Sequence, residues 1–183
     1  VRNSIDHSIS FYDSSVELYD SIFESSSTEG YSEYGTIDFR WSYVAPSVIA
    51  NNLEIRNVYN GHGMRLQSID SLSGSISISN VEVDNAFRSG LRLDNLDEST
   101  LDLTNITVTN SGYAGIQSTA VNGSLSQLTA TGNALGMTCD GMTTFDPCEN
   151  LALTGNSAGE HEGCADACLA LAGTGSDTGD TGD

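Results

Sequence analysis

The sequence repeats one short pattern along its length, and this repetition constrains the fold more than any other feature. Each copy opens with Asn or another polar residue and then alternates apolar with polar residues. The clearest copies run from Asn80 to Gly90 and from Asn105 to Gly115. The copies open at positions 15, 52, 80, 105, 127 and 150, so their spacings are 37, 28, 25, 22 and 23 residues. A period of this length predicts a solenoid of stacked coils.

Apolar residues alternate in three short bursts within each period. In one copy the bursts are Ile76 and Ile78, Val81 and Val83, and Leu91 and Leu93. Alternation with a period of two is typical of strands, so three bursts predict a coil with three faces. Because no copy can bury its apolar side alone, we expect the coils to stack about 4.8 Å apart in parallel ladders. The longest spacing contains the polar stretch 25–34, which we interpret as an inserted loop.

Certain residues recur at fixed places in the repeat. Asn52, Asn80 and Asn105 share one place, Asn57, Asn85 and Asn110 share a second, and Gly63, Gly90, Gly115 and Gly136 share a third. Asn tolerates left-handed backbone geometry, and its amide can bond the equivalent residue of the next coil. The glycines predict a sharp bend that needs freedom from Cβ.

With these repeats the sequence resembles the right-handed parallel β-helix proteins, a group that includes pectate lyases, polygalacturonases and many bacterial surface proteins. The resemblance covers roughly Ser15 to Asn156 and implies the right-handed sense of the coils. A left-handed hexapeptide helix would need a six-residue period, and an antiparallel sandwich would not repeat the same Asn and Gly places.

The predicted fold class is therefore all-β, a right-handed parallel β-helix of about six coils with a short disulfide-linked C-terminal cap. We expect the β-helix over residues 1–156, the cap over 157–172, and an acidic Thr-Gly-Asp linker or tail over 173–183.

The charge of the chain excludes several partners. The 25 acidic residues stand against 6 basic ones, all of them Arg, and the formal net charge is −19. A surface this acidic repels nucleic acid and anionic membranes, so no nucleic-acid partner is expected.

No apolar run approaches the ~18 residues of a membrane span, and no transmembrane segment is expected in this chain. We expect no cofactor, with Ca²⁺ as the one ion that the acidic composition would suit.

Four cysteines gather near the C-terminus: Cys139, Cys148, Cys164 and Cys168. An even, clustered set in an acidic chain predicts two disulfides, and the sequence leaves all three pairings open. A zinc site made from these cysteines and His161 is the alternative, although their spacing matches no strong zinc motif. Disulfides favour an extracellular or bacterial cell-surface location. The alanines and leucines around Cys164 and Cys168 predict a short helix in the cap.

The N-terminal end lacks an obvious cap. Ile5, Ile9 and Phe11 predict only a partial coil, and exposed strand edges at the end of a β-helix invite pairing with another chain. We therefore expect a missing N-terminal portion or a partner at this edge. A second copy of the chain would give a homo-oligomer.

The segment Gly61-His62-Gly63 resembles the Gly-His-Gly that polygalacturonases carry beside catalytic aspartates. This sequence lacks the paired Asp upstream and, having no Lys, the Arg-Ile-Lys downstream. Inverting hydrolysis needs an acid and a base carboxyl ~6.5–9.5 Å apart, and the motif offers no such pair. We expect a surface turn histidine and assign no catalytic residue. His62, Arg65 and Arg92 are the candidates if the chain is an enzyme.

The third strand of each coil carries a polar column on its outer side. The repeat places Arg65, Arg92, Gln117 and Thr138 in this column, with Asp38 above them. Two stacked like charges cost free energy unless an anion lies between them. That anion is either a ligand, such as a uronate or sulfated sugar bound by Arg65, Arg92 and Gln117, or an internal carboxylate from Asp70 or Asp94.

A second column, on another strand, is predicted to contain Glu17, Glu54 and Glu82. It could bind Ca²⁺, although three carboxylates in a line do not supply the six to eight oxygen ligands that the ion takes. Arg56 falls beside Asp84 of the next coil, which predicts an exposed ion pair.

Aromatic residues are concentrated in the N-terminal third, and the inserted loop carries Tyr31 and Tyr34. Exposed rings stack on sugars or on another protein, so these two tyrosines are candidate ligand-binding residues. The alternative is that the rings pack the loop against the coil.

These features together predict a non-catalytic, secreted or cell-surface β-helix module with a structural or adhesive role. It would contact a polysaccharide or a surface protein through an outer face. The basis is a well-formed repeat without a convincing acid–base pair, nucleophile or metal cage. One alternative is a polysaccharide lyase or glycoside hydrolase of the β-helix type, and another is a self-assembling surface or filament subunit.

Overall fold

The computed structural model describes residues 9–24, 33–70 and 72–168. This part of the chain forms eleven strands and no helix, so it contains no helix long and apolar enough to cross a bilayer. The strands are β1 (Ile9–Tyr12), β2 (Ser15–Glu24), β3 (Gly35–Trp41), β4 (Ser47–Val58), β5 (His62–Ser68), β6 (Ser75–Ala86), β7 (Leu91–Thr109), β8 (Ala114–Thr131), β9 (Leu135–Cys139), β10 (Thr144–Thr154) and β11 (Gly159–Glu162).

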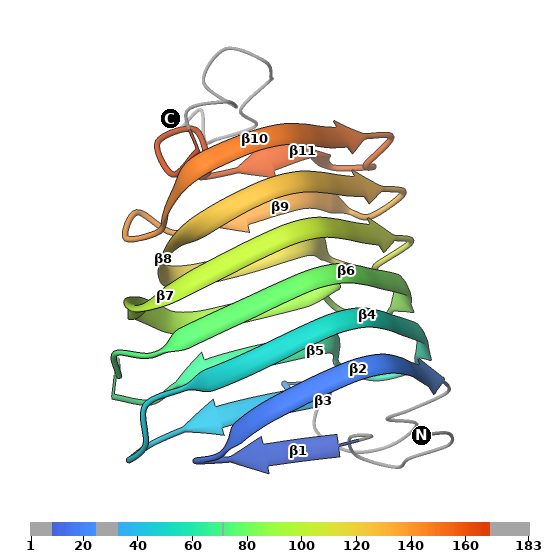
Figure 1. Ribbon diagram of the computed structural model, residues 1–183. Helices are drawn as coiled ribbons and strands as arrows, with labels where there is room; N and C mark the ends of the chain where they lie inside the picture. The colour runs from blue at the N-terminus through green and yellow to red at the C-terminus, as the bar shows by residue number, and fades with distance from the viewer. Residues whose placement is uncertain (1–8, 25–32, 71, 169–183) are drawn as a thin grey trace.

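Every strand pairs in parallel with the strand one coil away (Figure 1). One stack contains β2, β4, β6, the second halves of β7 and β8, and β10; the other contains β1, β3, β5, the first halves of β7 and β8, β9 and β11. In Figure 1 the chain crosses the front from left to right, returns behind and climbs toward the C-terminus, which is the right-handed sense. The predicted parallel β-helix of about six coils is confirmed.

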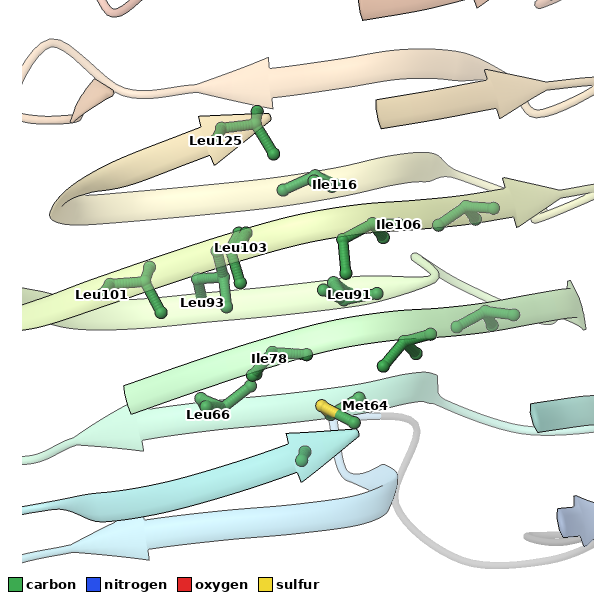
Figure 2. Close-up of a cluster of buried hydrophobic side chains, with 14 of the residues drawn as sticks. Met64, Leu66, Ile78, Leu91, Leu93, Leu101, Leu103, Ile106, Ile116 and Leu125 are labelled. Atoms are coloured by element: carbon green, nitrogen blue, oxygen red, sulfur yellow. The ribbon is translucent and has the colours of Figure 1, made fainter. Parts of the chain in front are cut away.

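The inward side chains form continuous apolar columns along the axis (Figure 2). One column contains Ile37, Met64, Leu91, Ile116 and Met137, and another contains Ile55, Val83 and Val108. All eight side chains are completely buried. Burying a side chain of this size contributes roughly 1.5–3 kcal/mol relative to leaving it exposed. The columns exist only because the coils lie directly over one another, as the pairing of Val81 with Ile106 shows.

The recurring asparagines form left-handed turns and hydrogen-bonded ladders, as predicted. The φ angles are 56° at Asn52, 53° at Asn80 and 54° at Asn105. The Nδ2 atom of Asn105 donates to Oδ1 of Asn80 at 2.7 Å, and Nδ2 of Asn85 donates to Oδ1 of Asn57 at 3.1 Å. These amides therefore set both the turn within a coil and the register between coils.

The predicted alignment of the first copy is wrong. Ser15 pairs with Ser47, which places Asp20 opposite Asn52. Asp20 has a φ of 49° and accepts a hydrogen bond of 2.6 Å from Nδ2 of Asn52, because a short carboxylate supports a left-handed turn as an asparagine does. Glu17 consequently lies opposite Ile49 and outside the predicted glutamate column.

The recurring glycines are required by space and not by a left-handed turn. None of Gly63, Gly90, Gly115 and Gly136 has a positive φ. A Cβ on Gly90 would lie 2.3 Å from Cγ1 of Val108, and a Cβ on Gly63 would lie 2.5 Å from Cγ1 of Val83. The coil is so narrow at this place that only glycine leaves room for the opposite wall.

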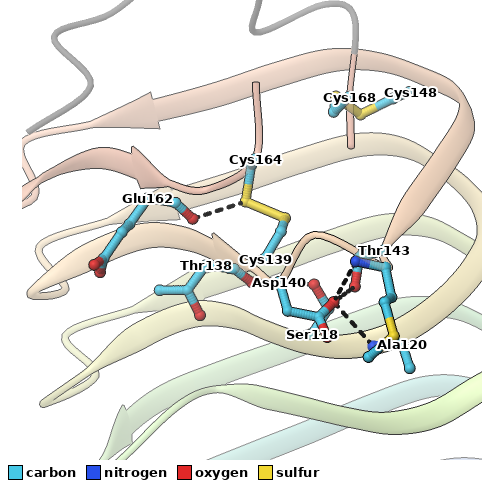
Figure 3. The surroundings of a disulfide bond; sticks show 11 residues. Ser118, Ala120, Thr138, Cys139, Asp140, Thr143, Cys148, Glu162, Cys164 and Cys168 are labelled. Carbon is cyan, nitrogen blue, oxygen red and sulfur yellow. Dashed lines mark hydrogen bonds between the residues drawn. A yellow bond between two sulfur atoms is a disulfide. The ribbon is translucent and has the colours of Figure 1, made fainter. Parts of the chain in front are cut away.

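The four cysteines form two disulfides, Cys139–Cys164 and Cys148–Cys168 (Figure 3). The first joins β9 to the turn that follows β11, and the second joins β10 to the same turn. Because all four sulfurs are in disulfides, the zinc alternative is wrong.

The cap differs from the predicted helix. Residues 164–168 form a single turn closed by a hydrogen bond of 3.0 Å from the Cys168 N–H to the Cys164 carbonyl. The rest of the predicted helix and the predicted tail over 173–183 lie outside the described residues. Strand β11 continues the stack to Glu162, beyond the expected end of the β-helix at residue 156.

Candidate functional site

One column of outward side chains runs the length of the solenoid, and we call it the outer column. It contains Ser10, Asp38, Arg65, Arg92, Gln117, Thr138 and Glu162. The predicted neighbours Arg65, Arg92, Gln117 and Thr138 are thus confirmed as members of one column. Parallel pairing places each member about 4.8 Å from the next.

The N-terminal half of the outer column belongs to a cluster of four arginines, Arg40, Arg65, Arg88 and Arg92, which we call the arginine cluster. Asp94 supplies the carboxylate between two of them: its Oδ2 lies 3.5 Å from Nε of Arg65 and 2.9 Å from Nε of Arg92. Asp38 is completely buried and lies 2.8 Å from Nε of Arg40 and 3.9 Å from Nη1 of Arg65. The internal ion pairs with Asp94 are therefore confirmed, whereas Asp70, the other candidate, is exposed.

Glu33 and Tyr34 cover this cluster from the end of the inserted loop. The Glu33 carboxylate bridges Nη1 of Arg88, at 2.7 Å, and Nη1 of Arg92. The Tyr34 ring centroid lies 4.1 Å from Cζ of Arg40 and 6.0 Å from Cζ of Arg65, which is cation–π geometry. Tyr34 therefore packs the loop against the coil, and Tyr31, the other candidate of that loop, lies outside the described residues.

Burial and hydrogen bonding set the charges of the cluster. Burial lowers the pKa of Arg65, and the nearby Asp38 carboxylate opposes that shift. Partial burial raises the pKa of Glu33, but the hydrogen bond from Arg92 and the charge of Arg88 lower it by more, so the carboxylate stays ionised. Three carboxylates thus neutralise most of the charge of four guanidinium groups.

His62 is completely buried, so the expected surface turn histidine is wrong. Its Nδ1 accepts the Ser89 N–H at 3.3 Å, and its Nε2 lies 3.4 Å from Nη1 of Arg92. Burial, followed by the charges of Arg92 and Arg88, lowers its pKa from 6.5 to about 3. The sequence places His62 at a turn, but the next coil packs against its ring through the Ser89 N–H and the Arg92 guanidinium. The His62 N–H continues the coil-to-coil ladder by donating to the Tyr34 carbonyl.

The C-terminal half of the outer column faces a hollow and contains no arginine beyond Arg92, although Thr138 itself is only 8 % exposed. The hollow is lined by Tyr113, Gln117, Thr119, Thr138, Asp140 and Glu162, and we call it the Gln117 hollow. The Ser89 hydroxyl donates to Oε1 of Gln117 at 3.0 Å, which turns the opposite, Nε2 end of the amide away from Ser89. Thr138 and Glu162 lie beside the Cys139–Cys164 disulfide, which holds this end of the hollow in place (Figure 3).

Asp140 gives the hollow a fixed negative charge. Its Oδ1 accepts hydrogen bonds from the Ala120 N–H at 3.0 Å, the Thr143 hydroxyl at 2.8 Å and the Met142 N–H at 3.2 Å. Partial burial raises the pKa of Asp140, but the hydrogen bonds, that of Ala120 foremost, lower it by more. The carboxylate is therefore ionised at neutral pH and disfavours anions in the hollow.

Three exposed aromatic side chains lie in the turns that lead into β5, β7 and β8; we call them the aromatic edge. They are Tyr59, Phe87 and Tyr113, which are 57 %, 59 % and 40 % exposed. The turns that carry Tyr59 and Phe87 stack directly, with the Phe87 N–H bonded to the Val58 carbonyl at 2.9 Å. In the next coil Gly112 stands opposite Phe87, and Tyr113 follows one residue later with its N–H bonded to the Arg88 carbonyl at 3.1 Å. Sequence reasoning missed this edge, although each ring follows the second asparagine of its repeat by two or three residues.

The predicted glutamate column is only partly present, because Glu17 lies opposite Ile49 and outside it. Glu54 and Glu82 are direct neighbours, but no group of three His, Cys, Asp or Glu residues that could hold a metal ion occurs among the residues with described positions. Arg56 stands opposite Asp84 as predicted. It pairs instead with Glu54 on its own strand, at 2.6 Å, because Asp84 already accepts hydrogen bonds from Thr109 and Asn110.

Comparison of the chain with protein-family models, with curated proteins and with solved structures finds no match. The outer column therefore has to be interpreted from its own geometry. Its N-terminal half is charged, neutralised and covered, whereas its C-terminal half is polar, open and bordered by exposed rings.

Proposed function

We propose that this chain is a non-catalytic extracellular β-helix module, with a structural or adhesive role, that contacts carbohydrate or a surface protein through the face of the outer column. The observation that carries the proposal is the contrast within that column. The charged side chains that catalysis would need lie in the arginine cluster, where they are ion-paired and mostly buried. The Gln117 hollow and the aromatic edge lie beside this cluster and are accessible to a ligand.

The state of His62 supports a non-catalytic role. A general base or acid must reach the substrate and have a pKa near the working pH. His62 is completely buried and its pKa lies at about 3. Arg65 and Arg92, the other two candidates of the enzyme alternative, are held by Asp94.

The two disulfides support an extracellular setting, because such bonds persist in oxidising compartments. We further propose that the repeat is of the pectate-lyase-like type found in many bacterial surface proteins. The cell-surface location and the adhesive role are proposed with it. The formal charge of −19 suits a module that stays dispersed outside the cell and does not bind nucleic acid.

Turnover and binding measured on one panel of polysaccharides test the proposal. We would incubate the chain with neutral and acidic polysaccharides and record new reducing ends, unsaturated products and the bound fraction. Binding without product release is expected. Product release that disappears in both His62→Ala and Arg92→Ala would establish the enzyme alternative and overturn the proposal.

Self-assembly is the second candidate, and the strand edges favour it. β1 and β2 end the two stacks, and no strand of the described residues covers their outer sides. On β2, Tyr19 and Ile22 are about half exposed. A chain that stacks end to end would show association that rises with concentration in sedimentation velocity, and a constant sedimentation coefficient across concentrations would reject it.

A further inference from the structure

We infer that the aromatic edge and the Gln117 hollow together bind a neutral polysaccharide strand lying along the solenoid axis. This inference deepens the proposed function and rests on it. It names the class of ligand and assigns Tyr59, Phe87 and Tyr113 as stacking residues, with Gln117 as the orienting polar contact.

The aromatic edge fits a sugar chain in its arrangement. The three rings stand on consecutive coils, and the coils rise about 4.8 Å each. A polysaccharide is likewise a regular row of rings, each with an apolar C–H face that packs on an aromatic side chain. Three rings that are 40–59 % exposed leave much of their surface for such a ligand while their other atoms are held by the coil.

The hollow fits sugar hydroxyls in its chemistry. A hydroxyl both donates and accepts, so it is satisfied by a mixture of amide, hydroxyl and carboxylate groups. Gln117 offers its Nε2 donors because Ser89 already occupies Oε1. Thr119 and Thr138 add hydroxyls, and Asp140 and Glu162 add acceptors. Tyr113 belongs to both features, since it lines the hollow and ends the aromatic edge.

The charges select a neutral ligand over an acidic one. The hollow contains two carboxylates and no cation, and the chain as a whole carries −19. The arginines that would bind a uronate or sulfate lie one or more coils away from the hollow. They are already paired with the carboxylates of Asp94 and Glu33. A polyanion would have to displace Glu33 and overcome repulsion from the rest of the surface.

Affinity electrophoresis and titration calorimetry with the whole chain test this inference. The neutral probes are a soluble β-glucan, a xyloglucan and a galactomannan, and the acidic probes are polygalacturonate and alginate. We expect binding to at least one neutral probe, weakened about fivefold or more by Tyr113→Ala and by Phe87→Ala, as for residues that anchor an interface. Tyr113→Trp should retain binding.

Tyr43→Ala is the matched control, because Tyr43 is 87 % exposed and lies between β3 and β4, outside the aromatic edge. It should bind as the unaltered chain does. Circular dichroism and thermal unfolding of each variant separate lost binding from lost folding.

The outcomes distinguish this inference from the function on which it rests. Binding only to acidic probes, lost in Arg88→Ala, would overturn the neutral ligand and leave a carbohydrate-binding module. Neutral binding that Tyr113→Ala and Phe87→Ala leave unchanged would overturn the site alone. Binding to none of the five probes would overturn the inference, and the proposed module would then have to contact protein.

Discussion

The two halves of the outer column share one backbone geometry and differ completely in what their side chains do. In the N-terminal half, Asp38, Arg65 and Arg92 are tied into an ion-paired cluster beneath Glu33 and Tyr34. In the C-terminal half, Gln117 and Thr138 line an open hollow. A solenoid thus repeats its backbone while each coil remains free to carry a different surface. Four predictions test this difference.

Removing Arg65 should give the largest effect, because its nearly buried guanidinium lies between two buried carboxylates, which Arg40 and Arg92 would then have to neutralise alone. Asp38 is completely buried and Asp94 nearly so. Breaking a buried pair by removing one partner costs about 3–5 kcal/mol of unfolding free energy, and we expect this from Arg65→Ala in urea denaturation. A loss below about 1 kcal/mol, the level of an exposed ion pair, would show that the cluster is not a buried network.

Lowering the pH should destabilise the covered half through His62. Its pKa is lowered from 6.5 to about 3 on folding, so its contribution is complete above pH 6.5 and is lost as the pH falls, because the unfolded chain then binds a proton that the folded chain does not. Each pKa unit corresponds to about 1.4 kcal/mol, so we expect a loss of roughly 2 kcal/mol between pH 7 and pH 5.

His62→Gln supplies the control for that pH dependence. The same denaturation series on this variant should lose about 2 kcal/mol less than the unaltered chain from pH 7 to pH 5, because the histidine that changes its protonation on unfolding has been removed. Equal slopes in the two proteins would show that His62 titrates normally and is open to water in solution.

Releasing the cover should have a smaller effect. Glu33→Gln removes the charge that bridges Arg88 and Arg92 but keeps the shape of the side chain. Because the Glu33 side chain is 52 % exposed, we expect a loss of at most about 1 kcal/mol. The loss should shrink at high salt, where exposed charges are screened. A salt-independent loss would contradict an exposed electrostatic contact.

Changing the open half should affect stability least. Phe87→Ala removes a ring that is 59 % exposed, so the unfolding free energy should change by no more than about 0.5 kcal/mol, whereas the affinity for a neutral glycan should fall. Arg65→Ala should lose unfolding free energy but keep its affinity for the neutral glycan, when the affinity is measured at a temperature where the variant is folded. Similar stability losses in the two variants would erase the distinction between the halves.

The fold was predictable because the features that define it are local and periodic. The alternation of Val81 and Val83 and the recurrence of Asn80 and Asn105 determine the strands, the turns and the stacking of the coils. The first copy was misaligned because Asp20 takes the place of an asparagine. A side chain that supports the same left-handed turn does not have to be the same residue.

The site was only partly predictable, because it depends on a segment that interrupts the repeat. The outer column, including Arg65 and Gln117, follows from the register. The burial of His62 does not, since it involves Ser89 and Arg92 of the next coil, and Arg92 is in turn held by Glu33. The disulfide connectivity could not be predicted from the sequence either, because four cysteines allow three pairings and their spacing does not choose among them.

The C-terminal half of the outer column is proposed as the binding surface and the N-terminal half as a structural cluster. Backbone amide NMR during titration with a neutral oligosaccharide tests it most directly. We expect shift changes at Phe87, Tyr113, Gln117 and Thr138 that saturate together, with Asp38, Arg40 and Arg65 unchanged. Changes centred on Asp38, Arg40 and Arg65, with the Gln117 hollow silent, would contradict it.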